Sequence, residues 1–95
     1  RPLVEAAYDG DTEQVRALLE QGSDPNGRTF KGRCALNAAA VNGHREVVEL
    51  LLEHGAEPNE WAMERSRENG HEDIAEFIER HLMEEAGENE AGKDE

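Results

Sequence analysis

The stretch GHREVVELLLEHGAEPN, residues 43–59, has a close counterpart earlier in this chain of 95 residues. Residues 10–26 read GDTEQVRALLEQGSDPN, and the two stretches align at a constant offset of 33. The shared positions are Gly10 with Gly43, Val15 with Val48, Leu18-Leu19 with Leu51-Leu52, Gly22 with Gly55, and Pro25-Asn26 with Pro58-Asn59. Self-similarity at a fixed period of this length indicates a repeat protein.

The repeat extends in both directions from this pair. Upstream, LVEAAYDG (3–10) aligns with LNAAAVNG (36–43) at the same offset. Downstream, ENGHEDIAEFIERHL (68–82) forms a third copy, in which Gly70-His71 takes the place of Gly43-His44. The offset to this copy is 27, so six residues are missing between the second and third copies.

Each copy has the pattern of two short antiparallel helices joined by a glycine turn. The first helix is rich in alanine, which lets helix backbones approach closely. The second has apolar residues at helical spacing. These residues are Val15, Leu18 and Leu19, then Val47, Val48, Leu51 and Leu52, then Ile74, Phe77 and Ile78. Asp11 and Gln14 are placed for a capping box, and Gly22 and Gly55 for left-handed helix ends.

Together these features resemble the ankyrin repeat. The period, the GH before the second helix, the Leu-Leu pair, the GSDPN and GAEPN segments and the Gly32 turn all match over about residues 3–82. The resemblance implies an all-α solenoid of stacked helix pairs over residues 1–83, divided at about 1–26, 27–59 and 60–83. It also implies one β-hairpin finger, from about Asn26 to Cys34, because the missing residues remove most of the second finger.

Two departures from the family pattern affect the helices. The family's Thr-Pro-Leu-His start is here Cys34-Ala35-Leu36-Asn37, so its usual hydrogen-bond network is changed. The alanine pair of the third copy is replaced by Ser66-Arg67, which we interpret as the polar face of a terminal cap.

Composition limits the remaining possibilities. Residues 84–95, EEAGENEAGKDE, hold six acids and no large apolar residue, so we expect an acidic disordered tail. The formal charge of −13 argues against nucleic-acid and anionic-membrane partners. The single cysteine, Cys34, cannot form an internal disulfide, which favours an intracellular location, cytoplasmic or nuclear. We expect a monomer.

One segment departs from the acidic character of the chain. Residues 25–45 contain no acid, and GRTFKGR (27–33) places three bases around Phe30. The family resemblance implies partner binding by finger tips and inner helices. By position, the finger contributes Arg28, Phe30, Lys31 and Arg33, and the inner helices contribute Tyr8, Asp9, Val41, Asn42, Glu68 and Asn69. Two alternatives remain open: Phe30 folds back onto the neighbouring finger or helix, and the bases serve only solubility or offset the acids nearby.

Catalytic and metal chemistry find little support in the pattern. The four histidines repeat structural positions: His44 and His71 begin second helices, and His54 and His81 end them. No spacing matches a zinc site, and Cys34 falls where a packed, inert thiol is expected. We therefore predict a noncatalytic protein-binding module that needs no cofactor or metal and binds a segment with acidic and apolar residues. The alternatives are an ankyrin-type kinase inhibitor and, least favoured, an enzyme.

Overall fold

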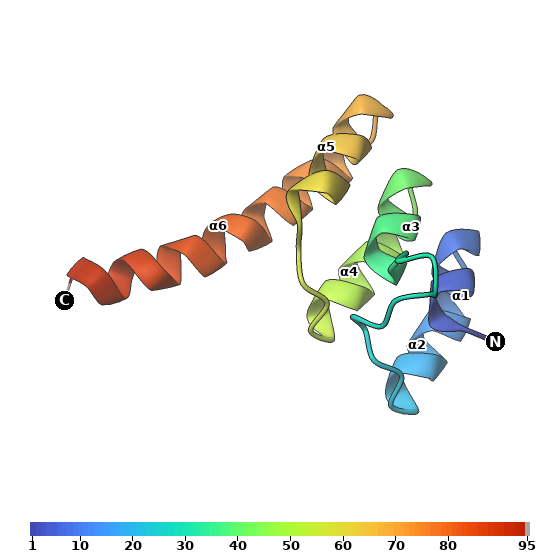
Figure 1. Cartoon of the computed structure of the whole chain (residues 1–95). Coiled ribbons are helices and arrows are strands. Elements are labelled where there is room, and N and C mark those ends of the chain that lie inside the picture. Colours follow the sequence, from blue (N-terminus) through green and yellow to red (C-terminus); the bar gives the residue numbers. More distant parts are fainter. Residues whose placement is uncertain (95) are drawn as a thin grey trace.

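A computed structural model describes the backbone of residues 1–94 and the side chains of residues 1–84. It contains the helices α1 (Leu3–Asp9), α2 (Thr12–Glu20), α3 (Ala35–Val41), α4 (Arg45–Glu53), α5 (Glu60–Glu68) and α6 (Glu72–Asp94). They form two layers (Figure 1): α1, α3 and α5 pack side by side in the inner layer, and α2, α4 and α6 form the outer layer. The predicted solenoid of helix pairs is confirmed.

Glycine turns join the two helices of each pair, as the repeat predicts. Gly10 and Gly43 adopt left-handed φ angles of 73° and 75°, which disfavour other residues. Each also lies under a histidine of the next copy. A Cβ on Gly10 would be 2.5 Å from His44 Nδ1, and one on Gly43 would be 2.7 Å from a ring carbon of His71. The glycines are therefore required both for the turn and for stacking.

The predicted caps of the outer helices are largely present. The Gln14 N–H donates to Asp11 Oδ1 at 3.2 Å and begins α2. The reciprocal half of the capping box is not formed, because the Asp11 N–H donates to Ala6 O instead. Gly22 follows the end of α2 with a φ of 104°. His54 ends α4 as predicted, whereas His81 lies inside α6, which continues past it.

The core lies between the two layers, and the inner helices contribute mostly small residues, apart from Leu36, whereas the outer helices contribute mostly large ones. Ala6, Ala7, Ala39 and Ala40 are fully buried in the inner helices. The outer helices contribute the larger buried side chains Val15, Leu19, Val47, Val48, Leu51, Ile74 and Ile78. Small inner residues allow close helix approach, and the large outer ones supply most of the apolar burial.

The third inner helix corrects the interpretation of Ser66-Arg67 as a polar cap. Ser66 is fully buried, and its hydroxyl donates to Ala62 O at 2.7 Å and approaches Ala40 O at 3.4 Å. Ser66 therefore occupies the position of the buried Ala39 in the preceding copy and packs α5 against α3. Only Arg67 is exposed, where it pairs with Glu72.

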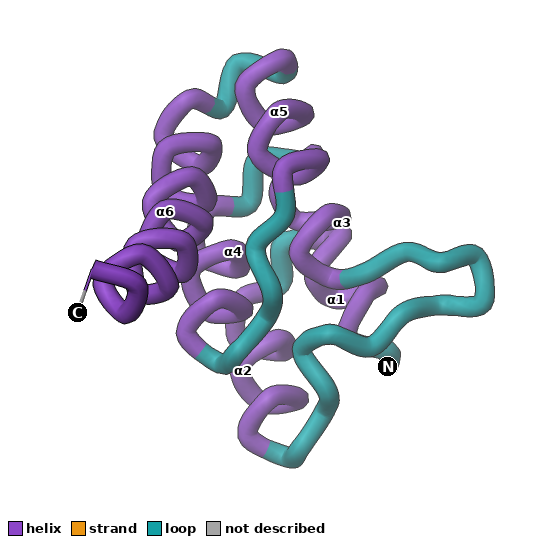
Figure 2. Tube along the Cα trace, turned by 60° about the vertical axis from the view of Figure 1, so that its left-hand side comes forward, coloured by secondary structure: helices purple, strands orange, loops and turns teal. Residues whose placement is uncertain are grey.

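The predicted β-hairpin finger is not confirmed as a hairpin. Within residues 1–94 no strand forms, and the segment between α2 and α3 is a projecting loop (Figure 2) closed by one isolated antiparallel bridge, Arg28 to Cys34. Thr29 organises its turn: the Thr29 N–H donates to Arg33 O, and its hydroxyl accepts from the N–H groups of Lys31 and Arg33. We call residues 27–33 the finger loop. The corresponding connection between α4 and α5 spans only residues 54–59.

Helix α6 continues to Asp94, whereas composition predicts a disordered tail over residues 84–95. Among the described side chains, Leu82 is the last that packs against the core. The side chains of residues 85–94, and all of residue 95, lie outside the part of the chain that the structure describes. The domain boundary at residue 83 therefore stays a prediction.

Replacing Ser66 with lysine should test its assignment to the core. We expect Ser66→Lys to lower the free energy of unfolding by more than about 2 kcal/mol, because it places a long cation in a fully packed site. The exposed Glu64 on the same helix offers a control, and Glu64→Lys should change stability by less than about 0.5 kcal/mol. Urea titration of both variants measures the difference, and equal midpoints would restore the polar-cap interpretation.

Amide hydrogen exchange decides where the folded domain ends. We expect the amides of residues 86–94 to exchange rapidly, while those of Ile74 and Ile78 are protected by the core. Removing residues 84–95 should leave the melting midpoint nearly unchanged. Protected amides beyond Glu85 would instead show that the extension of α6 is a stable helix.

Candidate protein-binding surface

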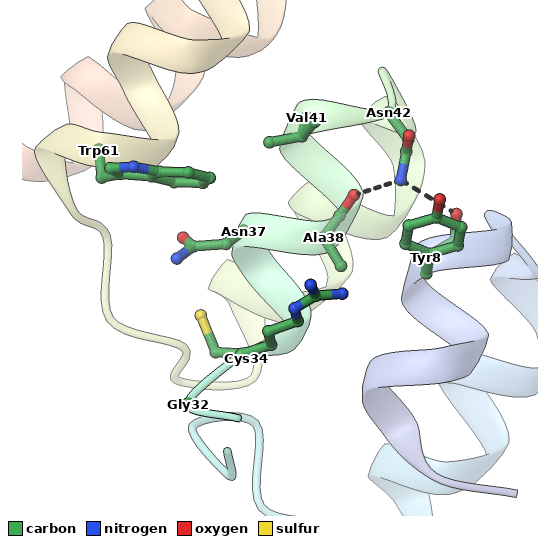
Figure 3. Close-up of a pocket in the computed structure, with 9 residues that line it drawn as sticks. Tyr8, Gly32, Cys34, Asn37, Ala38, Val41, Asn42 and Trp61 are labelled. Carbon is green, nitrogen blue, oxygen red and sulfur yellow. Dashed lines mark hydrogen bonds between the residues drawn. The ribbon is translucent and has the colours of Figure 1, made fainter. Parts of the chain in front are cut away.

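A groove runs across the inner helix layer between two exposed aromatic rings. Tyr8 from α1 and Trp61 from α5 lie on opposite sides of α3 (Figure 3), with 56% and 47% of their surfaces exposed. The groove has a volume of about 400 Å³. Its other lining residues are Gly32, Arg33, Cys34, Asn37, Ala38, Val41 and Asn42. We call it the Tyr8–Trp61 groove.

A second hollow of about 420 Å³ lies between the finger loop and α1. Phe30, Lys31 and Arg33 line one side, and Pro2, Val4 and Glu5 line the other. We call it the finger hollow. It shares Tyr8, Arg33 and Ala38 with the Tyr8–Trp61 groove, so the two form one continuous concave surface.

Phe30 projects from the finger loop into solvent. It is 97% exposed, so the alternative that its ring folds back onto neighbouring structure is wrong. The Lys31 ammonium lies 5.9 Å from the ring centroid, within the range of a cation–π contact. An aromatic ring this exposed beside cations has the composition of a binding site.

The bases of the finger loop differ from most of the other described bases of the chain in having no ion-pair partner. Four bases on the helical part of the chain are ion-paired: Arg1 with Glu5, Asp9 and Asp11; Arg45 with Glu49 and Asp73; Arg65 with Glu68; and Arg67 with Glu72 and Glu79. Within residues 1–84, Arg28, Lys31 and Arg33 form no such pair. The finger loop therefore carries three cations that have no acidic partner among the described side chains.

Two of the paired arginines have raised pKa values. The hydrogen bond from Arg45 to Glu49 raises the pKa of Arg45, with further contributions from the charges of Glu49 and Asp73. The hydrogen bond to Glu72 likewise raises the pKa of Arg67, against the opposing effect of desolvation. Both guanidinium groups thus stay charged and are ion-paired with acids of their own chain.

The predicted contact residues divide by position. Tyr8, Val41, Asn42 and Arg33 line the groove, and Phe30 and Lys31 line the finger hollow. Arg28 lies on the other side of the loop, where its guanidinium donates to Gly32 O at 2.9 Å and supports the turn. Asp9, Glu68 and Asn69 line neither concavity.

Asn42 and Asn69 also serve the stacking of the repeats. The Asn42 amide donates to Ala38 O at 2.9 Å and approaches Tyr8 O at 3.5 Å (Figure 3). His44 Nε2 lies 2.9 Å from the same Tyr8 carbonyl. One copy later, the Asn69 amide donates to Val41 O at 3.2 Å. These amides thus satisfy carbonyl groups at the end of the preceding inner helix.

Trp61 and Asn37 line the groove but were not singled out from the sequence. The deletion between the second and third copies brings Trp61 to the first turn of α5, at the position that corresponds to Cys34 in the preceding copy. The Arg65 guanidinium lies 5.4 Å from its ring centroid. The available signal was the only tryptophan of the chain in the polar segment PNEWAMERSREN.

Two observations concern the predicted thiol and metal ligands, and one concerns the membrane. Cys34 is 6% exposed, in agreement with the predicted packed thiol. Within residues 1–84, no three His, Cys, Asp or Glu side chains cluster as metal ligands would. None of the helices described is both long enough and apolar enough to cross a membrane.

Known proteins share the repeat. A family described as "Ankyrin repeats (3 copies)" matches residues 1–62. Ankyrin repeat domain-containing protein 46 of Danio rerio is 51% identical over 39 residues, which cover 41% of this chain and 17% of the relative. The proteins of the same name from Rattus norvegicus and Mus musculus are each 49% identical over 39 residues, with the same coverage. The chain thus matches only about a sixth of the length of these relatives.

Phe30→Ala should separate a role in binding from a role in folding. We expect this variant to change the free energy of unfolding by less than about 0.5 kcal/mol, because the ring packs on little else. As a control, Leu51→Ala removes a fully buried side chain and should cost about 2–5 kcal/mol. Urea denaturation measures the free energy of unfolding of both variants. A Phe30→Ala variant as unstable as Leu51→Ala would show that the ring packs in solution.

Proposed function

The chain belongs to the ankyrin repeat family, and on that premise we propose that it is a noncatalytic module that binds a segment of another protein on its concave surface. Ankyrin repeats generally act in protein–protein interaction. The observation that carries the proposal is the finger loop, where Lys31 and Arg33 have no acidic partner among the described side chains and line one hollow with the solvent-exposed Phe30.

The proposed partner segment carries acidic and apolar residues. The chain has a formal charge of −13, whereas residues 25–45 contain four bases and no acid. At physiological ionic strength charges interact over a Debye length of about 8 Å. An acidic segment is therefore attracted at the finger loop and repelled by most of the remaining surface, which selects one docking position.

Apolar contacts supply the second part of the proposed recognition. Phe30, Tyr8 and Val41 offer apolar surface along the two adjoining concavities. Aromatic side chains and arginines are the residue types that most often dominate binding energy at interfaces. We place Asp9, Glu68 and Asn69 at the rim of this surface and Asn42 within the groove, where polar and charged contacts contribute mainly to specificity.

The proposal extends to the setting of the protein. We infer that the chain acts as a monomer inside the cell, in the cytoplasm or the nucleus, on a protein partner rather than on nucleic acid or a membrane. Its single, buried cysteine suits a reducing compartment. Its acidity disfavours phosphate-rich surfaces.

Charge reversal on the finger loop tests the proposal. The probe is the tightest-binding peptide selected on this chain from a displayed random library. We expect Lys31→Glu with Arg33→Glu to weaken its binding about tenfold or more, a loss of ~1.4 kcal/mol. Raising the salt concentration from about 0.1 M to about 1 M shortens the Debye length from ~10 Å to ~3 Å and should weaken wild-type binding, mainly through slower association.

The matched control reverses two other unpaired bases. Arg16 and Arg80 are exposed on α2 and α6 and form no ion pair among the described side chains. Arg16→Glu with Arg80→Glu changes the net charge by the same amount and should alter affinity far less. Equal losses from the two double variants would contradict the proposed docking at the finger loop.

A further inference from the structure

The side chain of Asn37 is fixed in orientation by the cap of the following helix. The Ala62 N–H donates to Asn59 Oδ1 at 2.7 Å. A backbone N–H can only donate, so this contact identifies the Asn59 oxygen and leaves Asn59 Nδ2 as the donor. That group lies 3.0 Å from Asn37 Oδ1. The Asn37 oxygen therefore faces Asn59, and its Nδ2 must point elsewhere.

The remaining Asn37 amide group is an unused donor in the Tyr8–Trp61 groove. Asn37 is half-buried, lines the groove and lies between Trp61 and Ala38 (Figure 3). Within residues 1–84, Asn37 Nδ2 makes no hydrogen bond. No described side-chain nitrogen or oxygen is both buried and unpaired, so this donor is open to solvent and can exchange water for a ligand acceptor.

The other walls of the groove are largely apolar. Trp61 and Tyr8 close its two sides, and Ala38 and Val41 lie on α3 between them. A volume of about 400 Å³ is near the low end of the ~300–1,000 Å³ range of ligand pockets. It therefore suits one large side chain together with the backbone that carries it.

We propose that the Tyr8–Trp61 groove is a subsite for one large apolar side chain of an extended acidic segment of a partner protein. The Asn37 amide donates to a backbone carbonyl of that segment. Arg33, which lines both concavities, pairs with a neighbouring carboxylate. The proposal rests on the proposed function. It adds the residue that hydrogen-bonds the backbone of the partner segment and the pocket that accommodates its apolar side chain.

Charge complementarity selects this occupant. Arg33 has no acidic partner among the described side chains and lies where the groove meets the finger hollow, so a carboxylate beside the inserted side chain can reach it. A second copy of this chain is disfavoured as occupant, because each copy carries a formal charge of −13. Self-association through the groove is an outcome that the experiment below detects.

The probe is again the peptide selected from the displayed library. Trp61 is the only tryptophan of the chain, so its fluorescence reports directly on occupation of the groove. We expect saturation with the peptide to shift the Trp61 emission and to move the side-chain amide resonances of Asn37 in the NMR spectrum. The selected peptides should share a large apolar residue next to an aspartate or glutamate.

Asn37→Asp removes the donor but retains an oxygen for Asn59. We expect it to weaken peptide binding about tenfold, also at about 1 M salt, where charge repulsion is screened. The control Gln21→Glu makes the same amide-to-carboxylate exchange at an exposed position outside the groove. It should leave affinity within about twofold of the wild type. Trp61→Ala should also weaken peptide binding about tenfold, measured with a labelled peptide because the variant has no tryptophan.

The possible results separate this inference from the proposed function. If Lys31→Glu with Arg33→Glu weakens binding while the Asn37 and Trp61 variants bind as the wild type does, the subsite is wrong and the proposed function stands. If selection yields no acidic peptide, both fail. If sedimentation detects self-association that Trp61→Ala abolishes, the occupant of the groove is a second copy of the chain, and the proposed partner segment is wrong. If Asn37→Asp does not fold, unchanged Asn37 resonances in the saturated wild type would still overturn the proposal.

Discussion

Close approach of the inner helices is the constraint on which the remaining structure depends. Buried alanines on α1 and α3 remove side-chain bulk from the interface, and Ser66 continues this row on α5. The same spacing brings the carbonyl of Tyr8 within reach of His44, and that of Val41 within reach of Asn69. Each copy therefore satisfies polar groups at the helix end of the copy before it, as expected for a solenoid whose stability comes from nearest neighbours.

The deletion between the second and third copies shapes the concave surface. A full connection between α2 and α3 projects as the finger loop, whereas the short connection at residues 54–59 leads directly into α5. Trp61 follows on the first turn of α5, so the wall opposite Tyr8 is an aromatic ring. Because six residues are missing, no second loop projects between α4 and α5, and Trp61 forms one side of the groove instead.

The finger loop differs from most of the chain in that its bases are not ion-paired. Three helix arginines, Arg45, Arg65 and Arg67, form ion pairs with carboxylates of their own or a neighbouring helix, and those contacts raise the pKa of Arg45 and Arg67. The bases of the finger loop have no such partners in the described part of the chain. The contrast between the finger loop and the rest of the chain arises from the distribution of charge and is independent of the total charge.

The sequence by itself determined the helix pairs, the glycine turns, the buried leucines and the basic finger, because period, spacing and charge are local properties of the chain. It also predicted Tyr8, Val41, Phe30 and Arg33 as contact residues from their positions in the repeat. Only the tertiary structure decided that Ser66 is buried, that the finger is a loop held by Thr29, and that Trp61 and Asn37 face a groove. These features depend on which neighbour each side chain meets after the copies stack. The orientation of the Asn37 amide, for example, is fixed by Asn59, which lies 22 residues away.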